Sequence, residues 1–139
     1  IVDNAGGYLM QNGKVDLCLV GSDRTAMNGD VCNKIGTYLK AISAYENNIP
    51  FYVALPTSTI DRNLKKGSDI PIEIRDGKEL SDLVFEKSNK LFTGRIYKNK
   101  TKTFNPAFDI TPSKFITALI TENGICKADF SSIQRNLKV

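Results

Sequence analysis

The sequence has 139 residues and a net charge of +4, with 41% hydrophobic and 24% charged residues. This is the composition of one folded domain rather than of a disordered segment. Histidine is absent, which excludes a Ser-His-Asp triad and any histidine-ligated metal site. The three cysteines are odd in number and form no CxxC pair, so we expect reduced thiols in an intracellular protein.

Three further features of the sequence bear on its binding partners and on whether it is part of a longer polypeptide. Lys98, Lys100 and Lys102 form the clearest basic cluster, and a solvated loop is favoured over a nucleic-acid patch because no aromatic RNA-binding signature lies among them. No apolar run reaches membrane-spanning length and no signal peptide is visible, so we expect neither a membrane nor nucleic acid as a partner. Because the chain opens with Ile1 in what reads as the end of a strand, we expect it to be part of a longer polypeptide.

The first half of the chain predicts a βαβ unit. Residues 5–11 are expected to form a short helix that ends at Asn12-Gly13, and the apolar run 15–20 is expected to form a buried strand. A second strand is predicted over 51–55. Between the strands, apolar residues recur at helical spacing and predict a helix that ends at Asn47-Asn48: Val31, Ile35, Tyr38, Leu39, Ile42 and Tyr45. Such units build parallel sheets covered by helices, so the fold class is α/β.

The second half is less regular. Residues 70–74 are expected to form an edge strand, because Pro71 cannot donate to a central ladder. The mixed-charge region 76–102 predicts at most a helix around 79–85. Thr111 and Pro112 are good helix-start residues and predict a helix that runs to about residue 121. The last fifteen or so residues are expected to be peripheral.

The stretch GSDRTAMNGDVCNKIGT, residues 21–37, is more polar and longer than a simple strand–helix connection requires. Asp23 lies three residues after the first strand, at the edge of the sheet where open α/β folds bind ligands. A partly desolvated carboxylate there suits acid–base catalysis. The alternative is that Asp23 only pairs with Arg24 or caps backbone amides.

Lys34 adds an anion-binding feature to this stretch. If Asp30 caps the following helix, Lys34 lies in its first turn, where a bound anion would offset the unfavourable helix dipole. Gly29 would let the backbone approach a phosphate closely, and Gly36 inside the helix would be explained by close packing. The alternative is that Lys34 extends to water. Residues 57–59 could donate hydroxyl hydrogen bonds or form an ordinary turn. The residues alone therefore favour a site for a phosphorylated small molecule.

At these residues the chain resembles the 5-methylthioribose-1-phosphate isomerase family, which belongs to methionine salvage and is related to the initiation factor 2B alpha, beta and delta subunits. The resemblance rests on GSDRTAMNGDVCNKIGT, IPFYVALPTSTID, IPIEIRD and FNPAFDITPSKFITALITENGI, in the family's order. It covers residues 1–125 except for the poorly matched segment 77–103. It implies that 1–139 is a single portion of the family's Rossmann-like catalytic domain, with the family's N-terminal domain outside this chain.

The resemblance also implies roles for individual residues. Asp23 corresponds to the catalytic aspartate, and Asn33 and Lys34 correspond to a substrate-binding pair. The implied reaction converts a phosphorylated aldose into the ketose and needs no metal and no organic cofactor. The implied protein is a homodimer in the cytoplasm, and also in the nucleus of a eukaryote.

Two departures from the family pattern matter. The family's catalytic cysteine lies in an upstream Thr-x-Cys-Asn type of motif that is not present here, and Cys18, Cys32 and Cys126 do not match its position. The family's phosphate-holding arginine and glycine residues are also absent. A chain of this extent is therefore expected to carry half a site and to be inactive alone.

Two other functions stay open. Regulatory subunits of eukaryotic translation initiation factor 2B share the NKIGT stretch and the NPAFD-like turn, but are non-enzymatic; Asp23 and residues 56–61 favour the enzyme over them. A ribose-1,5-bisphosphate isomerase would keep the reaction type and change the substrate, but its signature is less similar around NGDVCNK.

Overall fold

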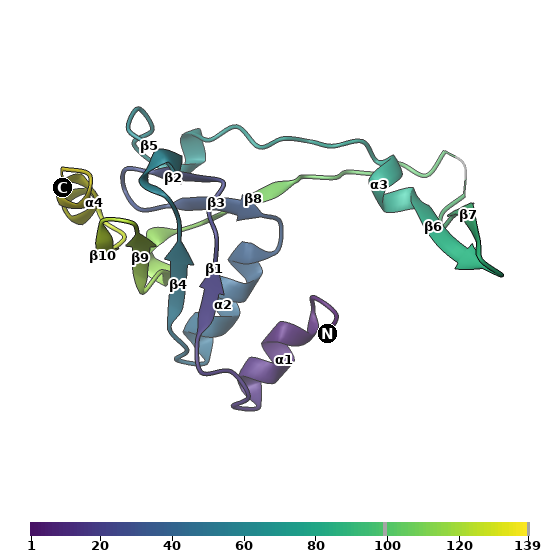
Figure 1. The fold of residues 1–139 in the computed structure, drawn as a ribbon, viewed down its shortest axis with the longest axis horizontal. Coiled ribbons are helices and arrows are strands. Elements are labelled where there is room, and N and C mark those ends of the chain that lie inside the picture. The colour runs from purple at the N-terminus through teal and green to yellow at the C-terminus, as the bar shows by residue number, and fades with distance from the viewer. Residues whose placement is uncertain (99, 139) are drawn as a thin grey trace. The chain divides into compact units, whose positions relative to one another are not determined.

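The computed structural model describes residues 1–98 and 100–138 (Figure 1). It groups into two compact units, Ile1–Pro71 with Phe108–Val139, and Ile72–Ala107. The regular elements of the first unit are α1 (Ala5–Gln11), β1 (Cys18–Val20), β2 (Arg24–Ala26), β3 (Val31–Lys34), α2 (Thr37–Glu46), β4 (Phe51–Ala54), β5 (Ile60–Asp61), β8 (Phe108–Thr111), β9 (Ala118–Thr121), β10 (Gly124–Cys126) and α4 (Phe130–Asn136). Those of the second are α3 (Lys78–Ser81), β6 (Asp82–Lys87) and β7 (Lys90–Arg95).

The first unit is built on a sheet of order β1-β4-β9-β10. Strands β1, β4 and β9 run parallel, and β10 is antiparallel to β9. Helix α2 connects the parallel neighbours β1 and β4, which is the βαβ unit that the sequence predicts (Figure 1). The predicted α/β fold is therefore confirmed, and so is the predicted helix 5–11.

The core of this unit lies between the sheet and the helices. Phe51, Val53 and Leu119 from the central strands are almost fully buried, together with Ile133 from α4. Ile133 is one of the last fifteen residues, so the prediction that the last fifteen or so residues are peripheral is wrong. No helix within the described residues is both long enough and apolar enough to cross a membrane.

Helix α2 turns an unexpected face to the core. Its buried residues are Thr37, Ala41 and Ala44, which are small enough for the helix to approach the sheet closely. The apolar positions that predict the helix lie mainly on its outer side, where Leu39 and Tyr45 are 65% and 62% exposed. The helical spacing was informative about the helix but not about which side is buried.

A second sheet of order β5-β2-β3-β8 follows the carboxyl ends of β1 and β4 (Figure 1). Strands β2 and β3 form an antiparallel hairpin, β8 pairs with β3, and β5 pairs with β2. Residues 31–34 are thus a strand, and α2 begins only at Thr37. The prediction that Asp30 caps a helix containing Lys34 is wrong.

Gly29 closes the turn of this hairpin in a backbone conformation that favours glycine, with φ of +90°. A Cβ atom at this position would lie 2.2 Å from the carbonyl oxygen of Ala128. The turn therefore packs directly on the backbone of the segment that leads into α4. Gly36 also has a positive φ, of +98°, and precedes α2 rather than lying inside it.

The predicted helix from Thr111 to residue 121 is also wrong. Thr111 ends β8, Pro112 precedes a short 3-10 helix over Ser113–Phe115, and residues 118–121 form β9. Ile116, Thr117, Ile120 and Thr121 are β-branched and favour a strand, and this preference outweighs the start signals of the Thr-Pro pair.

The second unit contains a two-stranded hairpin, β6–β7, in which the rings of Phe85 and Phe92 stack 5.9 Å apart. Instead of a helix over 79–85, it has the short α3 followed directly by β6. The expected edge strand 70–74 is reduced to one bridge between Ile74 and Pro106.

Candidate active site

An open groove of about 650 Å³ lies where the chain leaves β1 and β4. Asp23 and Arg24 line one side of it, and residues 57–63, which follow β4, line the other. Since β1 and β4 are parallel neighbours, their carboxyl ends meet at one edge of the sheet. This is the edge at which open α/β sheets bind ligands. The structure thus brings Asp23 and the PTSTID segment together.

Asp23 is held by its backbone and presents its side chain to solvent. Its amide donates to the carbonyl oxygen of Cys32 at 2.9 Å, which ties it to the β2–β3 hairpin. Arg24 pairs with Asp61 across the groove, at 3.9 Å, and not with Asp23. In the described ranges no cation lies within ion-pair distance of the Asp23 carboxylate. The partial desolvation that the sequence predicts for Asp23 is therefore not seen, and the exposed carboxylate is open to a ligand.

Cys32 lies directly behind Asp23 and is 3% exposed. Burial, together with the nearby carboxylates of Asp23 and Asp109, raises the pKa of its thiol to about 11, and the Arg24 guanidinium partly opposes this. Burial also raises the pKa of Cys18 and Cys126. All three thiols therefore stay protonated near neutral pH, which does not suit a thiolate nucleophile. Across residues 1–98 and 100–138, no three Cys, Asp or Glu side chains gather as a metal site would require.

Asn33 and Lys34 form the end of β3 and do not line the groove with Asp23. Asn33 is half-buried, whereas Lys34 is exposed, because successive side chains of a strand point to opposite faces. Both residues remain close to Asp23 along the hairpin, since its amide is bonded to the residue before Asn33. The anion site at a helix N-terminus that the sequence predicts for Lys34 is not formed.

Asp30 has a structural role instead of capping a helix. Its carboxylate accepts hydrogen bonds from the amides of Gly67 and Ser113, at 3.0 and 2.9 Å, and from the side chain of Asn28 at 2.8 Å. Three separate segments are thereby joined at the hairpin turn. The many polar residues of the 21–37 stretch are explained in part by this joint.

Two hydroxyls of the PTSTID segment form hydrogen bonds within the protein, one to a distant segment and one in its own turn. Thr57 donates to Glu122 through its amide at 2.9 Å and through its hydroxyl, and these bonds lower the pKa of the Glu122 carboxyl. The Thr59 hydroxyl donates to the carbonyl of Pro56 at 3.0 Å. The ordinary turn therefore accounts for Thr59, whereas Thr57 attaches this turn to Glu122 after β9.

Two residues that organise this region, Asp109 and Thr37, have no separate signal in the sequence. Asp109, on β8, accepts hydrogen bonds from the amides of Gly36 and Tyr38, and Thr37 bonds to Asn33. The only signal for Asp109 was its place in the NPAFD turn, and Thr37 appeared only as the last residue of NKIGT.

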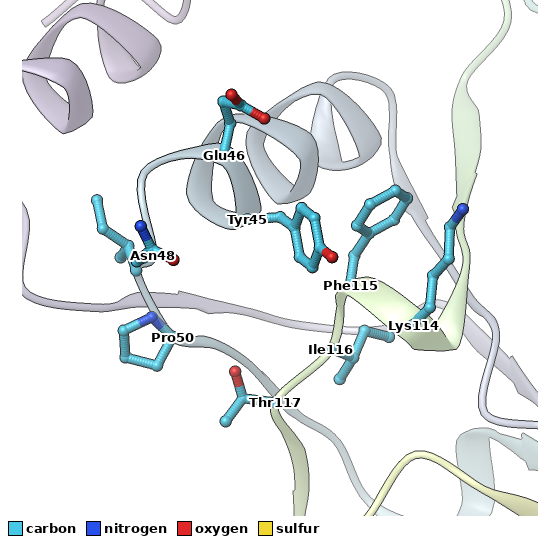
Figure 2. A pocket seen from close by; sticks show the side chains of 9 residues that line it. Tyr45, Glu46, Asn48, Pro50, Lys114, Phe115, Ile116 and Thr117 are labelled. Atoms are coloured by element: carbon cyan, nitrogen blue, oxygen red, sulfur yellow. The ribbon is translucent and has the colours of Figure 1, made fainter.

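A second hollow of about 630 Å³ lies at the opposite end of β4 (Figure 2). It is formed by the end of α2, by residues 48–50 and by residues 114–117. The rings of Tyr45 and Phe115 meet edge to face there, with 5.3 Å between their centres, and Lys114 lies over the Phe115 ring. The hollow is therefore lined by an aromatic pair at the amino end of β4, away from Asp23.

Comparison with known proteins decides the family. Residues 1–128 match the model of the initiation factor 2 subunit family. The chain belongs to this family. Within it, the chain is 54% identical over 134 residues to the methylthioribose-1-phosphate isomerase of Escherichia coli O45:K1, and 57% identical over 127 residues to that of Rhizobium meliloti. These alignments cover 96% and 90% of this chain, and the predicted resemblance is confirmed.

Solved structures of the family show the same fold. The 5-methylthioribose 1-phosphate isomerase from Pyrococcus horikoshii OT3 matches 99% of the chain with a TM-score of 0.87 at 40% identity. The translation initiation factor eIF-2B subunit delta from A. fulgidus matches 100% of it with a TM-score of 0.84 at 38% identity. The chain spans only 35–38% of the length of these four proteins.

Proposed function

We propose that this chain is part of an aldose–ketose isomerase that converts 5-methylthioribose 1-phosphate into 5-methylthioribulose 1-phosphate in methionine salvage. The identity of 54% to an isomerase over 96% of the chain carries this proposal. The groove beside Asp23 supports it, because an exposed carboxylate at the carboxyl ends of parallel strands is positioned to meet a ligand.

In the proposed reaction Asp23 acts as the acid. The substrate is closed as a ring 1-phosphate, so the ring oxygen must accept a proton before the ring opens. Hydrogen then moves from C2 to C1, which oxidises C2 to the ketone and reduces C1 within one molecule. No external oxidant or reductant is consumed. The C2 hydroxyl loses its proton as the ketone forms, and Asp23 recovers from it the proton that it gave to the ring oxygen.

Asn33 and Lys34 are proposed to bind the substrate. The exposed ammonium of Lys34 is a donor for a phosphate or hydroxyl oxygen, and the half-buried amide of Asn33 offers both a donor and an acceptor. The physical basis differs from the predicted one, because the end of a strand and not a helix N-terminus presents these groups.

We also propose that the protein is a cytoplasmic homodimer and that residues 1–139 are one portion of its catalytic domain. Exposed apolar side chains on and just before α2 support the dimer, because Ile35, Leu39 and Tyr45 are 46%, 65% and 62% exposed. A monomer's mass in solution scattering of the protein at full length would contradict it.

The deciding experiment is an isomerase assay on the protein at full length with 5-methylthioribose 1-phosphate. Formation of the ketose supports the proposal, and ribose 1,5-bisphosphate assayed in parallel tests the other isomerase. If the folded protein converts neither sugar, the result favours a second candidate function, that of a non-enzymatic regulatory subunit. The TM-score of 0.84 to the eIF-2B subunit supports this second candidate.

A further inference from the structure

The side chain of Asn33 is held by a residue outside its own strand. Its Nδ2 atom donates to Oγ1 of Thr37 at 3.1 Å, and that hydroxyl donates to the backbone carbonyl of Lys34 at 2.6 Å. Thr37 is the first residue of α2 and is 5% exposed. One buried hydroxyl thus connects the two residues proposed to bind substrate.

This connection determines which atom of the Asn33 side-chain amide faces Thr37 and which one faces away from it. A hydroxyl has one hydrogen, and that of Thr37 is used on the Lys34 carbonyl. Thr37 can therefore only accept from Asn33, so the amide must present its NH2 group to Thr37 and leave Oδ1 free. In the part of the chain that the structure describes, Oδ1 has no hydrogen-bond partner of its own.

Asp109 keeps Thr37 in place. Its two carboxylate oxygens accept from the amides of Gly36 and Tyr38, at 2.7 and 3.0 Å, on either side of Thr37. Gly36 has no side chain with which to cap α2, so a carboxylate from β8 caps the helix instead. In the β3–β8 register Asp109 also lies opposite Asn33.

We propose that Thr37 is a positioning residue that orients Asn33, so that Oδ1 accepts a hydrogen bond from a hydroxyl of the sugar phosphate. The inference rests on the proposed function, and it adds both a residue and the direction of one hydrogen bond. The recognised group is a donor, which is a sugar hydroxyl and not an ionised phosphate oxygen.

The test measures kcat and KM at full length for the parent, Thr37→Val, Thr37→Ser, Asn33→Ala and the double variant Asn33→Ala/Thr37→Val. Valine keeps the shape of threonine and removes the hydroxyl, and serine keeps the hydroxyl. We expect Thr37→Val to raise KM about tenfold with kcat within about twofold, as expected when a ground-state hydrogen bond is lost. Thr37→Ser should stay close to the parent, and the double variant should match Asn33→Ala.

The possible results separate the positioning role of Thr37 from the isomerase proposal itself. A parent KM in folded Thr37→Val, or effects of Thr37→Val and Asn33→Ala that multiply, would overturn the positioning role and leave the isomerase proposal intact. Absence of turnover in the folded parent would overturn both. If Thr37→Val does not fold, NMR of the parent decides: a hindered, slowly exchanging Asn33 side-chain amide supports the contact, and a freely rotating one overturns it.

Discussion

The chain contains two β-hairpins in contrasting surroundings. The β2–β3 hairpin has β5 on one side and β8 on the other, and Thr25, Ala26 and Val31 are fully buried. In the β6–β7 hairpin no further strand is paired to either side within the described residues, and Val84 and Leu91 are 67% and 75% exposed. A hairpin alone is marginally stable in water, so its neighbours determine how firmly it holds a side chain.

The carboxylates of the two regions also differ in which segments they bond to. In the first hairpin Asp30 joins three segments, and Asp109 from the adjacent strand β8 caps the helix that follows. In the second, Asp82 bonds to Arg95 within the hairpin itself, at 3.3 Å, close to solvent. The proposed site lies in the hairpin whose carboxylates reach other segments, which gives Asp23 and Asn33 fixed surroundings.

The largest effect is expected from Asp23→Asn, which keeps the shape of the side chain and removes the acid. We expect kcat to fall about 10³-fold while KM changes little, because general acid–base groups contribute on this scale. Steady-state kinetics at full length measure it, with thermal unfolding as the control for folding. A kcat within tenfold of the parent would mean that Asp23 is not the acid.

Lys34→Ala should have the next largest effect. Removing a charged donor to an anionic ligand should weaken binding of the sugar phosphate about 10- to 100-fold. Isothermal titration of the inactive Asp23→Asn background with substrate measures this directly. Lys14→Ala, at an exposed position before β1, is the matched control. Equal affinities of the two variants would remove Lys34 from the site.

Asp109→Asn tests by stability the carboxylate that β8, the strand beside the first hairpin, contributes to the start of α2. Asparagine offers only one acceptor to the amides of Gly36 and Tyr38, so we expect the free energy of unfolding to fall by about 1–2 kcal/mol. Asp82→Asn removes a carboxylate of the other hairpin and should produce a much smaller change. Urea unfolding of both variants provides the comparison, and similar losses would refute it.

The smallest expected effect is a change in the pH dependence of stability when Cys32 is replaced. Because its folded pKa is raised to about 11, the neutral thiol contributes stability that is complete below its ordinary pKa and is lost as pH rises through about 11. Cys32→Ala should therefore flatten the decline of stability between about pH 9 and 11. The parent protein is the control, and an equal slope in the parent and in Cys32→Ala would contradict the assignment.

Local signals in the sequence located the elements whose limits are set by nearby residues. Asn12-Gly13 ends α1 as predicted, and Asn47 ends α2. Asp30 was misplaced because it has the chemistry of a helix cap, yet its partners Gly67 and Ser113 are distant in sequence. Its role depends on tertiary contacts that no local pattern contains.

The same reasoning applies to the candidate site. Asp23 was found from its position after a strand, and the structure places it in the groove. Asn33 is a candidate by resemblance alone, and Lys34 both by its place in the polar stretch and by resemblance. The geometry predicted for Lys34 is wrong because residues 31–34 pair with β8 in a sheet. Thr37 and Asp109 could not be assigned from the sequence, since their roles depend on that pairing.

The contact of the Gly29 turn with Ala128 also sets an order of events during synthesis. The two residues are 99 positions apart, and a ribosome that adds about 5–20 residues per second needs about 5–20 s to make the intervening chain. Until then the turn has no backbone to pack against. The hairpin that carries the proposed site thus reaches its final packing only after residue 128 has been made, and a ribosome that stalls before residue 128 leaves the turn unpacked.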